Sequence, residues 1–101
     1  MALTPERKVK LLVRKVLDEL GAYYVMPVTG GYGNSGAPDF LACLRGRFIG
    51  IECKAGKGRT TALQEKNLSQ ITTSGGIALV INEENVGTLK QDLMSFYRSS
   101  S

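Results

Sequence analysis

The sequence of 101 residues predicts one α/β domain with the element order αβββαβα. Three observations predict this fold class. Apolar residues recur with helical period between residues 9 and 20, three strand-like runs follow between residues 22 and 54, and a short apolar run at 77–81 separates two further helical segments. The apolar fraction of 43% and the charged fraction of 22% are those of an ordinary globular domain with a single core.

The first helix is predicted to begin after Thr4 and to end before Gly21. Threonine is a favourable N-cap, proline stands at the first helical position, and glycine is common just past a helix end. Glu6 falls on the same stripe as the inward-facing apolar residues, whereas Glu19 falls on the solvent side. Glu6 is therefore a candidate site residue.

The middle of the chain is predicted to hold a strand, a loop and a hairpin. Residues 22–28 have the aromatic and β-branched content of a strand, and the glycine-rich stretch 29–37 is expected to be a loop. The runs 39–44 and 47–54 are also strand-like, and Arg45-Gly46 between them is a short turn signal. These two runs therefore predict a β-hairpin.

A two-residue turn would bring charged side chains together on this hairpin. Asp39 would stand directly opposite Glu52, and period two would put Lys54 on the same face. Two facing carboxylates repel each other unless a cation or a shared proton lies between them. With Glu6 from the first helix, the set offers hard oxygen ligands of the kind that Mg²⁺ or Mn²⁺ prefers.

A second helix is predicted over 61–74, because Thr61 and Gln64 have the spacing of a capping box and Gly75 follows as a stop signal. The run 76–82 that comes next is almost entirely apolar, as in a strand that is buried on both faces. These two elements complete the αβββαβ order.

The C-terminal part is predicted to form a last helix over 83–97, with Glu83 and Glu84 in its first turn. Residues 1–98 are expected to form one domain, and residues 99–101 a disordered tail. The sequence contains no internal repeat and no linker that would indicate a second domain.

Composition narrows the possible chemistry. Thirteen Lys and Arg against nine Asp and Glu give a net charge of +4, which permits a polyanionic partner. The absence of histidine excludes Ser-His and Cys-His nucleophile pairs and histidine zinc sites.

Cys43 and Cys53 form no C-x-x-C pair and are expected to be small buried hydrophobic residues. The longest apolar run, 77–81, is too short to cross a bilayer, so a cytoplasmic protein without a membrane segment is expected.

The glycine-rich stretch permits a different interpretation. Gly31, Gly33 and Gly36 spell G-x-G-x-x-G, which cradles a dinucleotide when a long helix follows the last glycine. Only eight residues separate Gly36 from the predicted hairpin turn, which leaves too little room for that helix. A P-loop is also disfavoured, because Lys57 is followed by glycine and not by Ser or Thr.

The ordered set of these segments resembles the PD-(D/E)xK nuclease superfamily, and within it the virus-type replication-repair nuclease domain, VRR-NUC. The bare pattern P-D followed by E-x-K is common by chance, and its order within the αβββαβ elements makes the resemblance specific. The resemblance spans nearly the whole chain. The matching segments are Glu6 on the first helix, "GAPD" (36–39), "ECK" (52–54), "GKGRTTALQ" (56–64) and "GGIALVI" (75–81).

The resemblance implies a restriction-endonuclease-like αβββαβ core, with a mixed sheet flanked by helices, followed by a C-terminal helix. It also implies Mg²⁺- or Mn²⁺-dependent hydrolysis of DNA phosphodiester bonds. Lys54 would orient or activate water and steady the phosphate, and Gln64 would position Lys54, water or substrate. The groups that the resemblance assigns to the metal are Glu6, Asp39, Glu52 and the backbone carbonyl of Cys53.

Stand-alone members of the family look like homodimeric four-way-junction resolvases of phage or prophage, so the resemblance implies a Holliday junction resolvase that acts on branched DNA in the host cytoplasm. The alternatives are a nuclease specific for flaps, ends or a short sequence, and a non-catalytic nucleic-acid-binding module. The basic candidates for contact with DNA phosphates are Arg45, Arg47, Lys57, Arg59 and Lys66.

Overall fold

The structure of the chain, a computed structural model, describes residues 3–28 and 36–99 and confirms the predicted α/β fold class. The elements follow the order αβββαβ and continue into a C-terminal helix, which a short 3₁₀ helix precedes. Their bounds are α1 (Pro5–Leu20), β1 (Tyr23–Val25), β2 (Phe40–Leu44), β3 (Arg47–Cys53), α2 (Ala62–Thr73), β4 (Ile77–Ile81), the 3₁₀ helix η1 (Val86–Thr88) and α3 (Leu89–Ser99).

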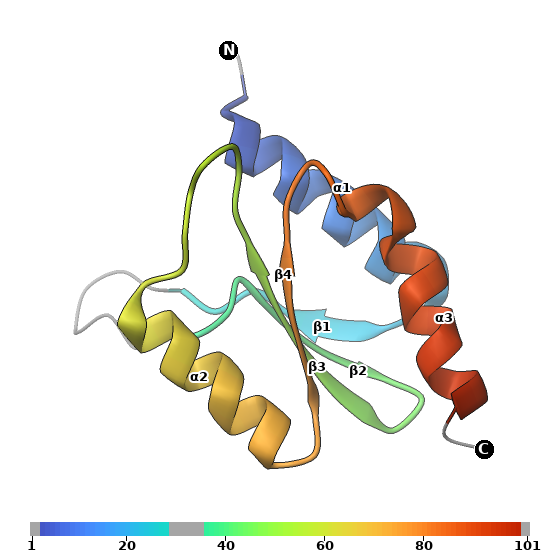
Figure 1. Cartoon of the computed structure of the whole chain (residues 1–101). Helices are drawn as coiled ribbons and strands as arrows, with labels where there is room; N and C mark the ends of the chain where they lie inside the picture. Colours follow the sequence, from blue (N-terminus) through green and yellow to red (C-terminus); the bar gives the residue numbers. More distant parts are fainter. Residues whose placement is uncertain (1–2, 29–35, 100–101) are drawn as a thin grey trace.

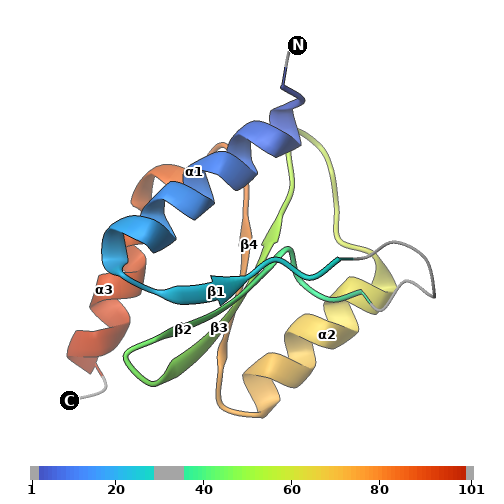
Figure 2. The ribbon, with the colours of Figure 1, turned by 180° about the vertical axis from the view of Figure 1, so that it is seen from behind.

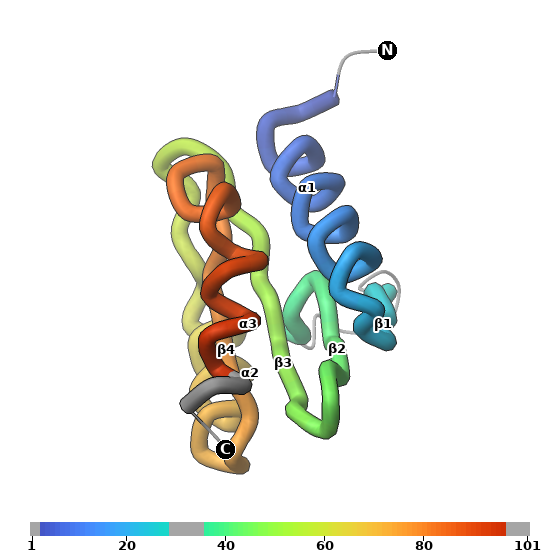
Figure 3. Tube along the Cα trace, turned by 90° about the vertical axis from the view of Figure 1, so that its right-hand side faces the viewer, coloured from blue at the N-terminus to red at the C-terminus, as the bar shows by residue number. Residues whose placement is uncertain are grey.

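The strands form one mixed sheet in the order β1-β2-β3-β4. β2 is antiparallel to β1 and to β3, whereas β4 runs parallel to β3 and follows α2 in the chain. Figure 3 shows the strands following one another across the molecule, with β1 and β4 at the two edges.

The helices form a layer on each face of the sheet. α1 and α3 lie on one face and α2 lies on the other (Figure 1), and the view from behind shows α1 leading into β1 (Figure 2). Glu52 alternates with Ile51 and Cys53, which face the core, so Glu52 faces the α2 side of the sheet. The core residues between the sheet and the α1–α3 pair are Val9, Val13, Leu17, Phe40, Ala42, Leu44, Ile49, Ile51, Cys53, Ile81, Leu89 and Leu93.

Helix α1 begins and ends where the sequence predicts. The Thr4 hydroxyl accepts a hydrogen bond from the Arg7 amide at 3.2 Å, and Gly21 caps the other end with a φ of 72°. Glu19 is exposed, as expected. Glu6 lies at the edge of the inward face, with 45% of its side chain exposed.

The β2–β3 hairpin has the predicted two-residue turn. Both residues of Arg45-Gly46 have positive φ, 49° and 83°, as in a type I′ turn. The strand register that follows from this turn continues to the pair of Phe40 and Ile51. Continued by one residue, this register would place Asp39 opposite Glu52, and the Asp39 side chain does contact the Cys53 amide next to Glu52.

Two glycines allow α2 to approach the sheet and the segment before β2. A Cβ atom on Gly50 would lie 2.5 Å from Cδ1 of Ile71. Gly36 is more restricted, because its φ is 70° and a Cβ atom there would lie 2.6 Å from Cγ of Leu63 and 2.9 Å from the Leu63 carbonyl carbon. Gly36 therefore fixes the path of the chain that leads to Asp39.

The predicted start of the last helix, at residue 83, is wrong. The Asn82 side chain accepts hydrogen bonds from the Glu84 and Asn85 amides, and the Asn85 side chain accepts one from the Asn82 amide. These bonds close a turn after β4, because asparagine side chains compete with helical hydrogen bonding. Glu83 and Glu84 stand in that turn, and α3 begins only after η1.

Two predictions of burial are also wrong. β4 is not buried on both faces, because it is an edge strand and Val80 is 40% exposed, whereas Ile81 on the core face is buried. Cys43 is exposed, since it alternates with the core residues of β2 and faces away from α1 and α3. Cys53 is buried as predicted, and both cysteines are free thiols.

The chain after Gly36 enters strand β2 and not a helix, which excludes the dinucleotide interpretation. Gly31, Gly33 and most of the loop predicted over 29–37 lie outside the described residues. α3 runs to Ser99, and the rest of the predicted tail also lies outside them. None of the helices in the described ranges is long and apolar enough to cross a membrane.

Gly36→Ala should lower the free energy of unfolding by at least about 1 kcal/mol, because alanine is strained at positive φ and its Cβ would collide with Leu63. Urea denaturation measures this change. Gly87→Ala is the matched control, since its Cβ atom would meet nothing within 4 Å. Equal stabilities of the two variants would contradict the role of Gly36.

Candidate active site

The predicted catalytic and metal-binding residues lie at one end of the β2–β3 hairpin, opposite the turn. The first turns of α1, the residue before β2, the end of β3 and the first turn of α2 meet there. Two sets of polar contacts lie side by side on the end of β3. Glu6, Lys10 and Asp39 lead to the backbone amide of Cys53. Lys54 and Gln64 contact Glu52, the residue before Cys53. The fold therefore assembles residues that are far apart in the sequence.

Glu52 is the most enclosed of these groups and is only 4% exposed. Its Oε2 atom lies 3.5 Å from Nζ of Lys54 and accepts a hydrogen bond from Nε2 of Gln64 at 3.1 Å. A buried carboxylate needs such partners, because leaving water is costly for a charged group. Lys54 is on the same face as Glu52, as the strand period predicts.

Gln64 caps helix α2 and also contacts Glu52, and its position in a capping box makes both contacts possible. Its Oε1 atom accepts a hydrogen bond from the Thr61 amide, and the Thr61 hydroxyl accepts one from the Gln64 amide, which completes the predicted box. The capping bond orients the side-chain amide so that its nitrogen faces Glu52. The start of α2 is thus tied to the site.

Asp39 is held by one backbone contact and one charged contact. Its Oδ2 atom accepts a hydrogen bond from the Cys53 amide at 2.7 Å, and its Oδ1 atom lies 3.4 Å from Nζ of Lys10. The first contact attaches Asp39 to the end of β3, beside Glu52. The second attaches it to α1.

Lys10 is the one residue of this cluster that the sequence analysis missed. Its Nζ atom lies 3.5 Å from Oε2 of Glu6 and 3.4 Å from Oδ1 of Asp39, so one ammonium bridges two carboxylates. Burial disfavours the charged ammonium, but the carboxylates of Asp39 and Glu6 outweigh this effect and raise the pKa of Lys10. The spacing of four residues between Glu6 and Lys10 on a predicted helix could have indicated this ion pair from the sequence.

Burial and the Asp39 carboxylate raise the pKa of Glu52 to about 7, although Lys54 acts in the opposite direction. Burial also raises the pKa of the Cys53 thiol to about 12, which keeps this thiol neutral. Besides burial, Asp39 and Glu6 raise the pKa of Glu52, so three acidic side chains near the end of β3 face two lysines, Lys10 and Lys54.

The donor chemistry of the site fits a hard divalent cation. The candidate ligands are carboxylate and carbonyl oxygens, which suit Mg²⁺ and Mn²⁺. Within the described ranges, no three His, Cys, Asp or Glu side chains lie close enough together to form a metal site. The carboxylates have other partners in this structure: Lys10 contacts Glu6 and Asp39, and Lys54 and Gln64 contact Glu52.

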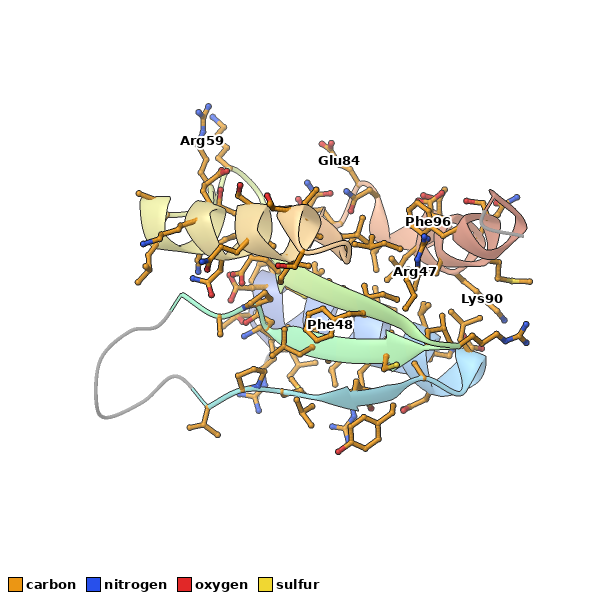
Figure 4. The ribbon with its side chains drawn as sticks, turned by 90° about the horizontal axis from the view of Figure 1, so that it is seen from below. Arg47, Phe48, Arg59, Glu84, Lys90 and Phe96 are labelled. Atoms are coloured by element: carbon orange, nitrogen blue, oxygen red, sulfur yellow. The ribbon has the colours of Figure 1, made fainter. Side chains whose placement is uncertain are left out.

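The predicted DNA-binding residues divide between the two ends of the molecule. Lys57 and Arg59 are exposed on the loop after β3, and Lys66 is exposed on α2, near the site. Arg45 and Arg47 are at the hairpin turn, about 20 Å from Asp39 at about 3.4 Å per strand residue. Figure 4 shows Arg59 on the α2 side of the molecule and Arg47 on the α3 side.

Comparison with solved structures found a chain described as "VRR_NUC domain". The two structures superpose with a TM-score of 0.72 over 88% of this chain and 97% of that chain, at 22% sequence identity. The chain has the VRR_NUC fold. The resemblance that the sequence indicated is thereby confirmed at the level of the fold. No family model matches the sequence, and a search of curated proteins found no significant match.

In metal-free buffer, the stability of this VRR_NUC fold should decrease between pH 4.5 and pH 7 through Glu52. Its pKa is about 7 in the folded protein against an ordinary 4.5, so the folded state binds this proton more tightly. The contribution of the Glu52 proton to the free energy of unfolding is complete below pH 4.5 and is lost as the pH rises to 7.

The measurement is urea unfolding against pH with EDTA, for the wild type, Glu52→Gln and the control Glu19→Gln. The stability of the wild type relative to Glu52→Gln should decrease across this window by up to about 3 kcal/mol. The wild type and Glu19→Gln should not diverge in this way. Parallel curves for wild type and Glu52→Gln would show that Glu52 does not titrate there.

Proposed function

We propose that this protein is a metal-dependent DNA endonuclease of the PD-(D/E)xK type. The observation that carries the proposal is the enclosed Glu52 carboxylate beside Asp39, with Lys54 at 3.5 Å from it. The VRR_NUC fold supports it, because a solved structure with that description has the same arrangement of elements. The chain has no histidine, and the ionisable side chains gathered at the site are carboxylates and lysines.

Under this proposal, Glu6, Asp39, Glu52 and the carbonyl of Cys53 hold Mg²⁺ or Mn²⁺. A divalent ion there supplies two effects: it lowers the pKa of water, and it offsets the charge that develops on the scissile phosphate. Both effects are useful for hydrolysis of a phosphodiester without a histidine base. The excess of acidic groups around Glu52 supports a cation at this position.

Lys54 and Gln64 orient the groups that take part in the reaction. The ammonium of Lys54, released from part of its interaction with Glu52, donates hydrogen bonds to a phosphate oxygen and to the attacking water. Gln64 holds the Glu52 carboxylate, and the Thr61 cap prevents the amide from turning away. Water and phosphate are thereby oriented by groups attached to β3 and α2, two elements of regular structure.

We further propose that the substrate is branched DNA, that the protein acts as a homodimer, and that it is a phage or prophage junction resolvase in the host cytoplasm. The exposed Lys57, Arg59 and Lys66 near the site are suited to phosphate contacts, which carry no base information. Recognition would then depend on DNA shape. A symmetric dimer would present two such sites to the two equivalent strands of a four-way junction.

Asp39→Asn should abolish cleavage of labelled DNA in Mg²⁺ or Mn²⁺ and leave the thermal unfolding temperature of the metal-free protein unchanged or higher. The reason is that the substitution removes a metal ligand and relieves repulsion of Glu52. Glu19→Gln, which alters an exposed acid on α1, should cleave like the wild type. Full activity of Asp39→Asn would refute the site, and inactivity of the wild type on every DNA would favour a non-catalytic binding module.

A fixed four-way junction should be nicked at symmetric positions, whereas linear duplex of the same sequence should not be cut. The measurement is mapping of end-labelled products with both substrates and a flap substrate, with and without Mn²⁺. Cutting of the linear duplex at one defined sequence would contradict the resolvase proposal and favour a sequence-specific nuclease. Preference for the flap would favour a flap nuclease.

A further inference from the structure

Lys10 occupies a position that the proposed metal also needs. Its ammonium contacts Oε2 of Glu6 and Oδ1 of Asp39, and the second oxygen of Asp39 is bound to the Cys53 amide. Lys10 therefore uses the Asp39 oxygen that the backbone contact leaves accessible. A divalent ion and an ammonium on the same carboxylate oxygens would repel each other strongly.

A basic cavity lies next to this position. It has a volume of about 420 Å³ and lies between α1 and the segment after β1. Three of its lining residues are basic and follow one another at spacings of three and four on one face of α1. These are Arg7, Lys10 and Arg14, and the lining also includes Glu6, Leu11 and Met26.

Two basic residues of this cavity differ in mobility: hydrogen bonds hold Arg14 in place, whereas the side chain of Lys10 is flexible. Nε of Arg14 donates a hydrogen bond to the Tyr24 hydroxyl at 3.1 Å, and that hydroxyl donates one to Asp18 at 2.8 Å, so the guanidinium of Arg14 is held in place. Lys10 is 31% exposed and has a flexible four-carbon stem. Its Nζ atom can leave the carboxylates for the cavity by rotation of its own side chain.

We propose that Lys10 is a mobile counter-ion that leaves Glu6 and Asp39 when a divalent ion binds them, and that it then joins Arg7 and Arg14 in binding a DNA phosphate. The inference rests on the proposed function and assigns a phosphate site to the face of α1 that carries Arg7, Lys10 and Arg14. Metal and DNA would then bind with positive coupling, and each would strengthen the other by the same factor.

The first test measures Mn²⁺ affinity without DNA by isothermal titration calorimetry. Lys10→Met should bind Mn²⁺ roughly threefold to tenfold more tightly than the wild type, because no cation has to be displaced. Lys15→Met removes the same charge from an exposed position of the same helix and should bind like the wild type. Lys10→Gln provides a second variant, and thermal unfolding verifies that each protein is folded.

The second test measures the affinity for a fluorescent four-way junction with and without Ca²⁺. Ca²⁺ should strengthen DNA binding by wild type and Lys15→Met at least about threefold more than by Lys10→Met. Equal Mn²⁺ affinities of Lys10→Met and Lys15→Met, or equal effects of Ca²⁺ on their DNA binding, would overturn the inference and leave the proposed nuclease intact. Absence of Mn²⁺ binding by the wild type and by both variants would refute the proposed function, and this inference with it.

Discussion

Glu52 is a carboxylate that is 4% exposed and lies at the end of β3, beside a second carboxylate, Asp39. A charge in such a place costs several kcal/mol unless hydrogen bonds or opposite charges replace the water that it loses. Lys54 and Gln64 supply these contacts at 3.5 Å and 3.1 Å. The positions of β3 and of the start of α2 are therefore linked through one buried acid, and the chemistry of the site depends on this link.

Because β3 and the start of α2 are linked in this way, residues that shape the local backbone also position the groups of the site. Thr61 and Gln64 cap α2, and the cap also directs the Gln64 amide to Glu52. Gly36 allows the segment before β2 to pass close to Leu63 in the first turn of α2, and three residues later Asp39 reaches the end of β3. Each of these residues shapes an element and places a functional group, so a change at one of them affects both.

Charge balance at the site comes from elements that are distant in the sequence. The carboxylates are contributed by α1, by the residue before β2 and by β3, and the lysines by α1 and the residue after β3. Lys10 offsets part of the charge of Glu6 and Asp39, and Lys54 offsets that of Glu52. The acidic groups can therefore remain close together in the folded chain, and both ammonium groups lie where a bound cation or a phosphate would affect them.

Much of the site followed from the sequence because its geometry is set by short-range rules. A two-residue turn at Arg45-Gly46 fixes the register, which brings Asp39 to the end of β3 beside Glu52, and the period of two puts Lys54 on the face of Glu52. The helix starts at Thr4 and Thr61 are equally local, because an N-cap depends on residues within one turn. These features required no knowledge of how the elements pack.

Tertiary structure decided what depends on the neighbours of an element. Lys10 looks like half of an ordinary surface ion pair with Glu6, and only the packing of α1 against the hairpin brings it to Asp39. The exposure of Val80 follows from the edge position of β4 in the sheet, which the apolar run alone did not reveal. Local patterns set backbone conformation and facing direction, whereas contacts between distant segments set burial and charge pairing, because those depend on which surfaces the whole chain brings together.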